Sequence, residues 1–481
     1  MVKEMEKDMD TERVFEIFRE ISAVPRGSYH NEKINRYLVE WAEKHQLSYE
    51  TDEAENVIIR KSGTKGYENS DTVILQGHMD MVCEKTAGSE HDFETEGLEL
   101  ITEGDYLSAK DTTLGADDGI AVAMALAVLE SDDISHPPLE AVFTTDEEVG
   151  MFGAAALDKS KLKGKYLINI DSEEEGTLLV SCAGGMTARV KFSPKFETVS
   201  GVQITLTVEG LKGGHSGTEI QKNRTNASDL LVRILYEMPE NSFRLSSFTG
   251  GDKDNVITNR AEAVIVVEDT DLFFDRYDTI EEAMVTELAS KEPDMEISVT
   301  YRKAEKVSVI DEASQSNILA FLSLVPKGVQ VMSGDMEGVV ESSLNMGAAT
   351  LSEEETLFGF SIRSQKKSYK YYLYQKLVTL SKLCGGSADM YGEYPSWDFR
   401  DNSRLRDVMK KVYEKQYGEE PVVTGIHAGL ECGIFYEAMN DIDIVSIGAD
   451  TFDIHTPNER LSISSTTRVY QFLLEVLKEL N

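Results

Sequence analysis

Apolar residues in the first part of the chain occur first at helical spacing and then in short β-rich runs. Between Thr11 and Gln46 the helical spacing is interrupted at Pro25, which predicts two helices. Strands are predicted over residues 56–61, 72–78, 139–145 and 166–171. An amphipathic helix is predicted over residues 117–131. This alternation predicts an α/β catalytic domain, a mixed sheet flanked by helices, in which function gathers at the strand ends.

The pattern changes after about residue 186 to longer β-rich segments with helices between them, which predicts an α+β domain. From about Gly385 the α/β pattern returns. We therefore expect a catalytic domain over residues 1–185 and 386–481, split by an inserted α+β domain over residues 186–385. A short echo between the segments that begin at Asn255 and Ser342 suggests that this insertion contains two subdomains.

Charge and composition exclude several classes of partner. The chain has 481 residues, with 48 Lys and Arg against 86 Asp and Glu, which gives a net charge of −38. Nucleic acid and anionic membrane surfaces would be repelled by this excess of acid. The charged N-terminal region and the lack of a long apolar stretch lead us to expect a cytoplasmic protein. The four cysteines are far apart and indicate neither a disulfide framework nor a cysteine zinc site.

Two pairs of chemically active residues lie at element boundaries. The strand over residues 72–78 leads into His78 and Asp80, which point to the same side of an extended chain. The carboxylate can then orient the imidazole of a metal ligand, although a hydrogen-bonded histidine at a strand end is the simpler interpretation. Asp117 and Asp118 begin the next helix, where they either cap it or supply a carboxylate that bridges two metal ions.

Further acids and a histidine follow later strands. Glu147 and Glu148 lie directly after the strand over residues 139–145, and they can supply a general base and a metal ligand side by side. A solvated acidic loop is the alternative. Asp171 ends another apolar run, where a turn-forming aspartate is the alternative, and His455 lies in a loop. All these positions are strand ends, helix starts or loops, where α/β proteins build their sites.

Six motifs occur in order along the chain: QGHMDMVCEK, LGADDGIAVAMALA, TTDEEVGMFGA, INIDSEEEG, KGGHSGTEI and IHTPNERL. Together they resemble the zinc-dependent peptidase family that includes the carboxypeptidase G type enzymes, the aminoacylases and the cytosolic dipeptidases. The resemblance covers essentially the whole chain. Within the family it is strongest to the aminoacyl-histidine dipeptidases, of the peptidase D and carnosinase-like type.

The resemblance implies a site for two divalent metal ions. His78 and Asp171 would bind one zinc, Glu148 and His455 the other, and Asp117 would bridge them. Three protein ligands for each ion and a shared water give the four positions of a catalytic zinc site. Because the ligand atoms are only nitrogen and oxygen, Mn and Co are also compatible.

Catalytic roles follow from the same resemblance. Glu147 would accept a proton from the metal-activated water and pass it to the leaving amine. Asp80 would steady a metal-binding histidine, and the family has a cis peptide after Asp117. His215, in the inserted domain, matches the family histidine that stabilises the oxyanion, so catalysis would require domain closure.

Substrate recognition is expected from the inserted domain and a later glycine-rich segment. Arg363 matches the family position that binds the C-terminal carboxylate of the substrate, a task suited to a guanidinium. Asn255 resembles a further substrate-binding position. The glycines around Gly429 would allow close approach of backbone to a ligand, and His427 and Glu431 would contact the substrate's amine or imidazole or belong to a structural loop.

These expectations define a dizinc metallopeptidase that hydrolyses dipeptides, Xaa-His and carnosine-like dipeptides in particular. The first alternative is a broader di- or tripeptidase, or an N-acyl amino acid deacylase, because the fold and metal ligands are shared and only the pocket differs. A catalytically silent metal-binding protein is the second. The length of the insertion resembles the double lid of the bacterial dipeptidases, and either a monomer or a homodimer is compatible with the sequence.

Overall fold

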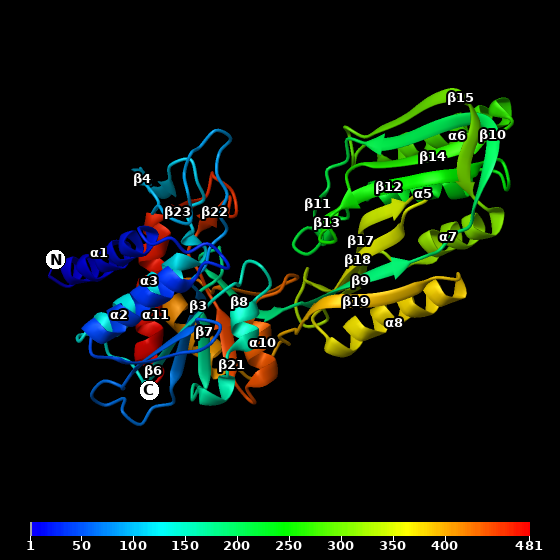
Figure 1. Cartoon of the computed structure of the whole chain (residues 1–481). Coiled ribbons are helices and arrows are strands. Elements are labelled where there is room, and N and C mark those ends of the chain that lie inside the picture. Colours follow the sequence, from blue (N-terminus) through cyan, green and yellow to red (C-terminus); the bar gives the residue numbers. More distant parts are fainter. Residues whose placement is uncertain (1) are drawn as a thin grey trace. The chain divides into compact units, whose positions relative to one another are not determined.

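The computed structural model describes residues 2–481, with side chains described from residue 11 onward. Its contacts divide the chain into two compact units (Figure 1). Unit 1 comprises Met1–Ser181, Trp397–Gly425 and Leu430–Asn481. Unit 2 comprises Cys182–Ser396 and Ile426–Gly429 and so interrupts unit 1 in the sequence.

Unit 1 is built on an eight-stranded mixed sheet with the order β1-β2-β6-β3-β7-β21-β8-β20. Its strands are β1 (Ser48–Thr51), β2 (Val57–Lys61), β3 (Val73–His78), β6 (Leu139–Thr144), β7 (Tyr166–Asn169), β8 (Thr177–Cys182), β20 (Val422–Ile426) and β21 (Asp443–Ser446). Strand β3 pairs in parallel with both β6 and β7, and β7 pairs in parallel with β21. These four central strands are buried along their whole length, as expected for strands covered on both faces.

Helices cover this sheet: α1 (Val2–Ser22), α2 (Glu32–Lys44), α3 (Ala116–Glu130), α4 (Phe152–Ala156), α9 (Arg404–Tyr417), α10 (Glu431–Ala438), α11 (Ile463–Glu479) and the 3-10 turn η1 (Lys159–Lys161). Helix α3 packs on β3, and α1 covers α3. The prediction of an amphipathic helix at α3 is therefore wrong: almost all of its residues are buried, because it lies between the sheet and another helix.

A small antiparallel sheet completes unit 1, with the order β22-β23-β5-β4. Its strands are β4 (Leu100–Glu103), β5 (Tyr106–Ala109), β22 (Thr451–Phe452) and β23 (Arg460–Ser462). Strand β23 pairs with β5 from a distant part of the sequence. This pairing brings the C-terminal loops of the unit to its N-terminal half.

Unit 2 contains a nine-stranded antiparallel sheet. Eight of its strands follow the order β15-β10-β14-β12-β17-β18-β9-β19, and the ninth, β16, pairs with β17 outside this order. The strands are β9 (Gly184–Lys191), β10 (Phe196–Glu209), β12 (Arg244–Asp252), β14 (Ala261–Val267), β15 (Glu296–Ile310), β16 (Gly328–Met332), β17 (Val340–Leu351), β18 (Thr356–Ser364) and β19 (Ser387–Tyr394). The helices are α5 (Ala227–Glu237), α6 (Thr270–Leu288), α7 (Glu312–Leu324), α8 (Lys367–Leu383) and the 3-10 turn η2 (Ile220–Lys222). A two-residue pair, β11 (Gly214–His215) with β13 (Val256–Ile257), lies outside the large sheet.

The large sheet of unit 2 consists of two halves with the same βαββαβ order. One half runs β10-α5-β12-β14-α6-β15 along the chain and β15-β10-β14-β12 across the sheet. The other runs β9-α7-β17-β18-α8-β19 and lies across the sheet as β19-β9-β18-β17. Each is the ferredoxin-like arrangement, and the first half is inserted after β9 of the second. The expected fold class, an α/β sheet interrupted by an α+β insertion, is confirmed, and the double lid remains a prediction.

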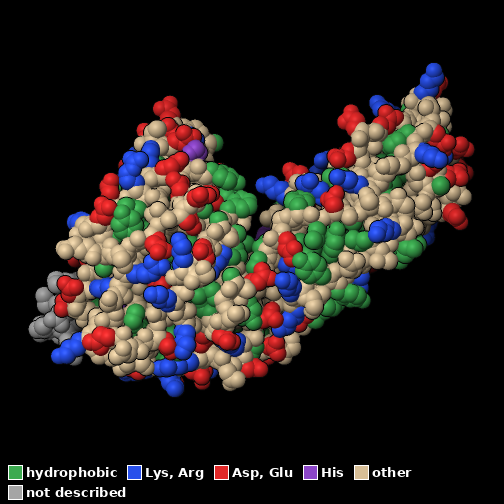
Figure 2. Space-filling model, turned by 60° about the horizontal axis from the view of Figure 1, so that its bottom comes forward, with side chains coloured by type: hydrophobic (Ala, Val, Ile, Leu, Met, Phe, Trp, Pro, Cys, Tyr) green, Lys and Arg blue, Asp and Glu red, His purple; other side chains and the backbone are tan. Residues whose placement is uncertain are grey.

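Acidic side chains are distributed over the surface shown in Figure 2, interleaved with Lys and Arg. None of the helices within residues 2–481 is both long and apolar enough to cross a membrane. Within residues 11–481 none of the four cysteines forms a disulfide, and Cys83 is exposed whereas the other three are buried.

Candidate metal centre and substrate-binding residues

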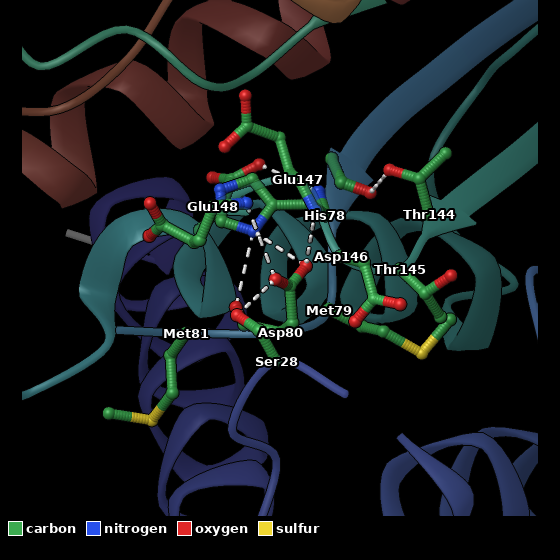
Figure 3. A network of polar contacts seen from close by, with 12 residues as sticks. Ser28, His78, Met79, Asp80, Met81, Thr144, Thr145, Asp146, Glu147 and Glu148 are labelled. Carbon is green, nitrogen blue, oxygen red and sulfur yellow. Dashed lines mark hydrogen bonds and ion pairs between the residues drawn. The ribbon is translucent and has the colours of Figure 1, made fainter. Parts of the chain in front are cut away.

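The ends of three parallel strands bring acidic and histidine side chains together in unit 1. His78 is the last residue of β3, Glu147 and Glu148 lie in the loop after β6, and Asp171 follows β7 by two residues. Because neighbouring parallel strands end at the same edge of the sheet, these residues share one edge. Figure 3 shows His78 close to the loop that carries both glutamates.

Two histidines approach the carboxylate of Asp117 from different segments. His78 Nε2 lies 2.9 Å from Asp117 Oδ1 and 3.6 Å from Asp171 Oδ1. His455 Nε2 lies 3.1 Å from Asp117 Oδ2 and 2.9 Å from Glu148 Oε2. Asp117 thus contributes one oxygen to each histidine, which is the arrangement expected of a carboxylate between two cation sites.

This donor set fits a pair of divalent cations. Ligand atoms bonded at about 2.1 Å to one metal ion lie roughly 3–3.5 Å from each other, which is the spacing between the histidine nitrogens and the carboxylate oxygens here. In addition, Glu148 Oε1 is buried without a hydrogen-bond partner among the described residues, as befits a carboxylate oxygen that binds a cation. All the donor atoms are nitrogen or oxygen, which does not select zinc over manganese or cobalt.

Asp118 also lies within reach of a cation, whereas the family resemblance assigned the role of metal ligand to Asp117 and not to Asp118. His78, Asp118 and Asp171 form one group whose ligand atoms all lie within 4.8 Å of one another, and His78, Asp117 and Glu148 form a second. The Asp118 side chain already accepts a hydrogen bond from the backbone N–H of His78, at 3.2 Å. The peptide bond between Asp117 and Asp118 is cis. The adjacent acids in the sequence were the signal that both side chains matter.

Asp80 is a buried acceptor that connects the histidine strand to the glutamate loop (Figure 3). Its Oδ1 lies 3.4 Å from His78 Nδ1 and accepts the backbone N–H of Glu147 at 3.1 Å. Its Oδ2 accepts the Ser28 hydroxyl at 2.8 Å and the Glu148 N–H at 3.4 Å. Burial raises the pKa of Asp80, but the contacts with His78 and these donors outweigh it and hold the pKa below its usual value. Asp80 therefore acts as an anion that orients both elements.

The three consecutive acids after β6 have different environments. Asp146 has a positive φ of 52°, and its Oδ1 accepts the Tyr29 N–H at 2.7 Å and the Asn31 side-chain amide at 2.8 Å. It is a turn residue. Burial raises the pKa of Glu147 well above its ordinary value, and the charges of Asp171, Glu431 and Glu148 raise it further. Glu147 thus holds a proton more readily than an ordinary glutamate, which suits a group that accepts a proton from water.

Proton affinities at the centre follow from burial and pairing. Hydrogen bonds to Asp117 and Glu148 raise the pKa of His455 to about 11. Burial opposes the charged form of His78, but its three carboxylate partners raise the pKa well above the usual value. Burial also raises the pKa values of Asp171 and Glu148. Without a metal ion, the centre therefore holds protons where a cation would otherwise lie.

Glu431 lies beneath the strand ends, at the start of α10. Its Oε2 accepts the Gln76 amide at 2.5 Å and the Thr144 hydroxyl at 2.6 Å. The side chain is fully buried, and burial raises its pKa to about 7. Its other oxygen, Oε1, has no hydrogen-bond partner among the described residues. The structure thus places this expected substrate-binding residue in an enclosed position below the metal centre.

Unit 2 contains a second group of expected site residues, around Arg363. Arg363 Nη1 donates to the Tyr394 hydroxyl at 2.7 Å, and Nη2 lies 3.4 Å from His215 Nε2. The guanidinium is buried, and its Nε has no hydrogen-bond partner among the described residues. Buried Lys370 holds Tyr394 from behind, by donating to its carbonyl at 2.7 Å. A buried cation with unused donors is suited to binding a carboxylate.

The neighbours of His215 determine which ring nitrogen carries the proton. The backbone N–H of Thr218 donates to Nδ1 at 3.2 Å, so Nδ1 is the acceptor and Nε2 carries the proton in the neutral ring. Burial and the charge of Arg363 lower the pKa of His215 to about 4, so the ring is neutral near pH 7. His215 Nε2 and Arg363 Nη2 are then two donors side by side. One oxygen atom of a ligand can accept from both.

The other residues expected to bind substrate lie beside this pair. Asn255 is exposed and precedes Val256, which pairs with His215. A side chain at Gly429 would meet the Tyr394 ring at 2.7 Å, so the glycine makes room for the tyrosine that holds Arg363. His427 is buried and bonded to Ser343 at 2.7 Å. Burial and the charge of Arg363 lower its pKa to about 3.

A cavity of about 380 Å³ opens beside the metal centre in unit 1. Its walls combine apolar and acidic side chains. The lining includes Tyr29, Met81, Phe93, Glu84, Glu94 and Glu148. Because Glu148 belongs to both the cavity and the metal centre, a molecule in the cavity would lie next to the cations.

Several known peptidases resemble this chain in sequence and fold. A sequence model of the peptidase family M20/M25/M40 matches residues 74–479. The cytosol non-specific dipeptidase of Escherichia coli (strain K12) is 37% identical over 472 residues, which cover 97% of each chain. The crystal structure of the aminoacylhistidine dipeptidase from Vibrio alginolyticus has 35% identity and a TM-score of 0.88, over 97% of this chain and 96% of that one.

A more distant structure shares the fold. The aminopeptidase PepT from Bacillus cereus has a TM-score of 0.55 at 17% identity, with 98% of both chains covered. The expected peptidase family is confirmed by the sequence model and by the two full-length relatives. The chain belongs to the peptidase family M20/M25/M40.

Proposed function

We propose that this chain is a dipeptidase with a dinuclear metal centre, acting on dipeptides that include Xaa-His. The observation that carries the proposal is the convergence of two histidines on the two oxygens of Asp117, with Glu147 near His78 (Figure 3). The names of the E. coli and Vibrio relatives support dipeptides, and aminoacyl-histidine among them, as substrates. The E. coli name also supports a location in the cytosol.

His78 and Asp171 would hold one ion, Glu148 and His455 the other, and Asp117 both. We expect zinc, which suits three protein ligands of nitrogen and oxygen for each ion. Bound divalent ions supply Lewis acidity, which polarises a scissile carbonyl and lowers the pKa of a water molecule.

Glu147 accepts a proton from the attacking water and delivers it to the leaving amine. Asp80 fixes both partners of this step, because the same carboxylate contacts the His78 ring and the Glu147 backbone N–H. The negative charge of Asp80 also favours binding of cations by His78 through its other nitrogen.

The group in unit 2 recognises the carboxyl half of the dipeptide. Arg363 binds the terminal carboxylate, with Asn255 and the backbone near Gly429 as further contacts. His215 donates a hydrogen bond from its Nε2 N–H to the developing oxyanion. The amino half of the dipeptide occupies the cavity beside Glu148, where acidic side chains attract the free amine. Glu431, which is buried below the metal centre, contributes to binding of the amino half of the dipeptide.

Residues 186–385 act as a lid and residues 1–185 with 386–481 as the catalytic domain. Hydrolysis then requires the two to come together around the substrate, because the proposed base Glu147 and the proposed oxyanion donor His215 are in different domains. The two halves of the unit 2 sheet support a double lid, in which one chain supplies both halves of the closed site. Either a monomer or a homodimer satisfies this arrangement.

A panel of substrates, with metal analysis of the same sample, tests the proposal. We expect hydrolysis of Ala-His and β-alanyl-histidine, about two equivalents of divalent metal, and little activity on N-acetyl amino acids. Glu147→Gln should keep the metal and lower kcat by about 10²–10⁴-fold, because a general base contributes that much. Preferred cleavage of N-acetyl amino acids would indicate a deacylase, and near-normal turnover by Glu147→Gln would refute the base.

A further inference from the structure

A buried carboxylate from the C-terminal part of unit 1 binds the segment that carries Asp117. Glu459 is 2% exposed, and both of its oxygens accept backbone N–H groups. Oε2 accepts from Leu114 at 2.8 Å and Gly115 at 2.9 Å, and Oε1 from Ala116 at 2.8 Å and Asp117 at 3.4 Å. One side chain therefore holds four consecutive amides, including that of the residue shared by the two histidines.

The position of these amides explains why an external carboxylate is needed. They lie at the start of α3 and before a kink, because Asp117 and Asp118 have non-helical backbone angles. The regular part of the helix therefore offers these N–H groups no partner. The N-cap residue is Gly115, which has no side chain to accept them. Glu459 supplies the acceptors that these amides lack.

Arg26 holds the same segment from the other side. Its guanidinium is buried, with Nη1 donating to the carbonyls of Met79 and Asp80 at 3.2 Å each, and Nη2 donating to the carbonyl of Gly115. An added Cβ at Gly115 would lie 2.5 Å from Arg26 Nη2, and one at Gly119 would lie 2.6 Å from it. The two glycines that flank the paired acids thus make room for this arginine.

Together the two residues connect three ligand-bearing segments. Glu459 lies four residues after His455 and binds the Asp117 segment, and Arg26 connects that segment to the stretch after His78. Burial lowers the pKa of Arg26, and the nearby negative charge of Glu459 partly offsets this effect. The clamp, as we call Arg26 and Glu459, contacts backbone only at these segments and leaves the ligand side chains free.

We propose that Arg26 and Glu459 are positioning residues for the metal centre, which fix the backbone of Asp117 relative to His78 and His455 before a cation binds. The inference rests on the proposed function only in that the centre binds divalent metal. A preorganised set of ligands loses less freedom when it binds an ion, so the clamp should raise metal affinity. A purely structural role would alter thermal stability and leave the affinity unchanged.

Titration of the chelated protein with zinc ion alone, followed by calorimetry, tests the proposal. Glu459→Gln keeps the size of the side chain but replaces one acceptor oxygen with an NH₂ group that faces backbone donors. We expect its zinc affinity to fall by about 10–100-fold, as for other residues that orient metal ligands. Glu103→Gln, at an exposed position of the same unit, is the matched control and should bind as the wild type does.

Arg26→Lys provides an independent variant, since it keeps the positive charge but cannot contact three carbonyls with a planar group. We expect an affinity loss of at least tenfold here too. Zinc affinity within about twofold of wild type in a folded Glu459→Gln or Arg26→Lys protein overturns the proposal. Wild-type protein that binds no zinc would instead refute the proposed function.

Amide hydrogen exchange of the wild type tests the clamp without a substitution. Leu114 to Asp117 should exchange slowly in the chelated protein as well as in the zinc-loaded protein, because Glu459 holds these amides before metal binds. Fast exchange of these amides in the chelated protein, with protection only after zinc is added, would overturn the proposal even if both variants fail to fold.

Discussion

His215 can donate a proton from one ring nitrogen only, and Thr218 determines which. Because the Thr218 N–H occupies Nδ1, the Nε2 proton faces the neighbouring Arg363 and any ligand between them. Gln at position 215 can place an N–H near the former Nε2, whereas Asn places one near Nδ1. We expect His215→Asn to lower kcat by about 10²–10³-fold, the cost of losing one oxyanion donor, and His215→Gln to lose less.

Kinetics of the two variants with the same dipeptide provide the measurement. The pKa of His215 is about 4, so the ring gains its second proton only below that pH and keeps one donor proton above it. A wild-type kcat governed by His215 is therefore flat near neutrality. Equal losses in His215→Asn and His215→Gln would argue against donation from Nε2.

At the scale of elements, β3 and α3 approach so closely that β3 requires a glycine before its last residue. A Cβ at Gly77 would lie 2.5 Å from Asp118 Oδ2 and 2.6 Å from the Ala121 side chain. Gly77→Ala should push α3 away from His78 and destabilise the protein by about 1–3 kcal/mol, as other overpacked cores are. Gly334→Ala is the control, because no atom lies within 4 Å of its added Cβ. Urea denaturation and metal content measure both effects, and a Gly77→Ala protein as stable as the control would contradict this packing.

Helices and strands with a regular spacing of apolar residues could be predicted from the sequence, whereas the elements that pack around them could not. The strands that lead to His78 and Asp171 were visible as short apolar runs, because both faces of a central strand are covered. The apolar pattern of α3 was interpreted as one face of a helix, although the helix is enclosed by β3 and α1. The acids after β6 were correctly located as a group, but a string of like residues does not reveal that Asp146 forms the turn.

At the scale of the molecule, the inserted α+β domain could be predicted because its longer strands change the pattern of the sequence. The echo between Asn255 and Ser342 did not identify the repeat: the first segment precedes the third strand of one half, and the second lies in the second strand of the other. The bonds between Glu459 and Leu114 span 345 residues. No local pattern marks such a contact, since a single acid in a polar loop resembles any of the other acids in the chain.

Metal binding by the whole molecule should depend on pH through its histidines. Without metal, the carboxylates raise the pKa values of His78 and His455, the latter to about 11, so both rings are protonated near pH 7. Each must lose its Nε2 proton to bind a cation, and affinity therefore increases about tenfold per pH unit for each proton released. The raised pKa of His455 stabilises the chelated protein fully below about pH 6.5, its unfolded value, and this contribution disappears as pH rises through about 11.

The stabilisation of the folded protein by bound metal should thus increase from about pH 6 to about pH 8. As pH rises, fewer protons compete with the metal for the two histidines, and these histidines add no further stability to the chelated protein. Thermal unfolding of loaded and chelated samples at several pH values measures this difference. Calorimetric titrations in two buffers with different ionisation enthalpies count the protons released, and His455→Asn should release about one fewer. A wild-type titration that releases no protons near neutrality would show that the carboxylates do not hold these histidines in the charged form.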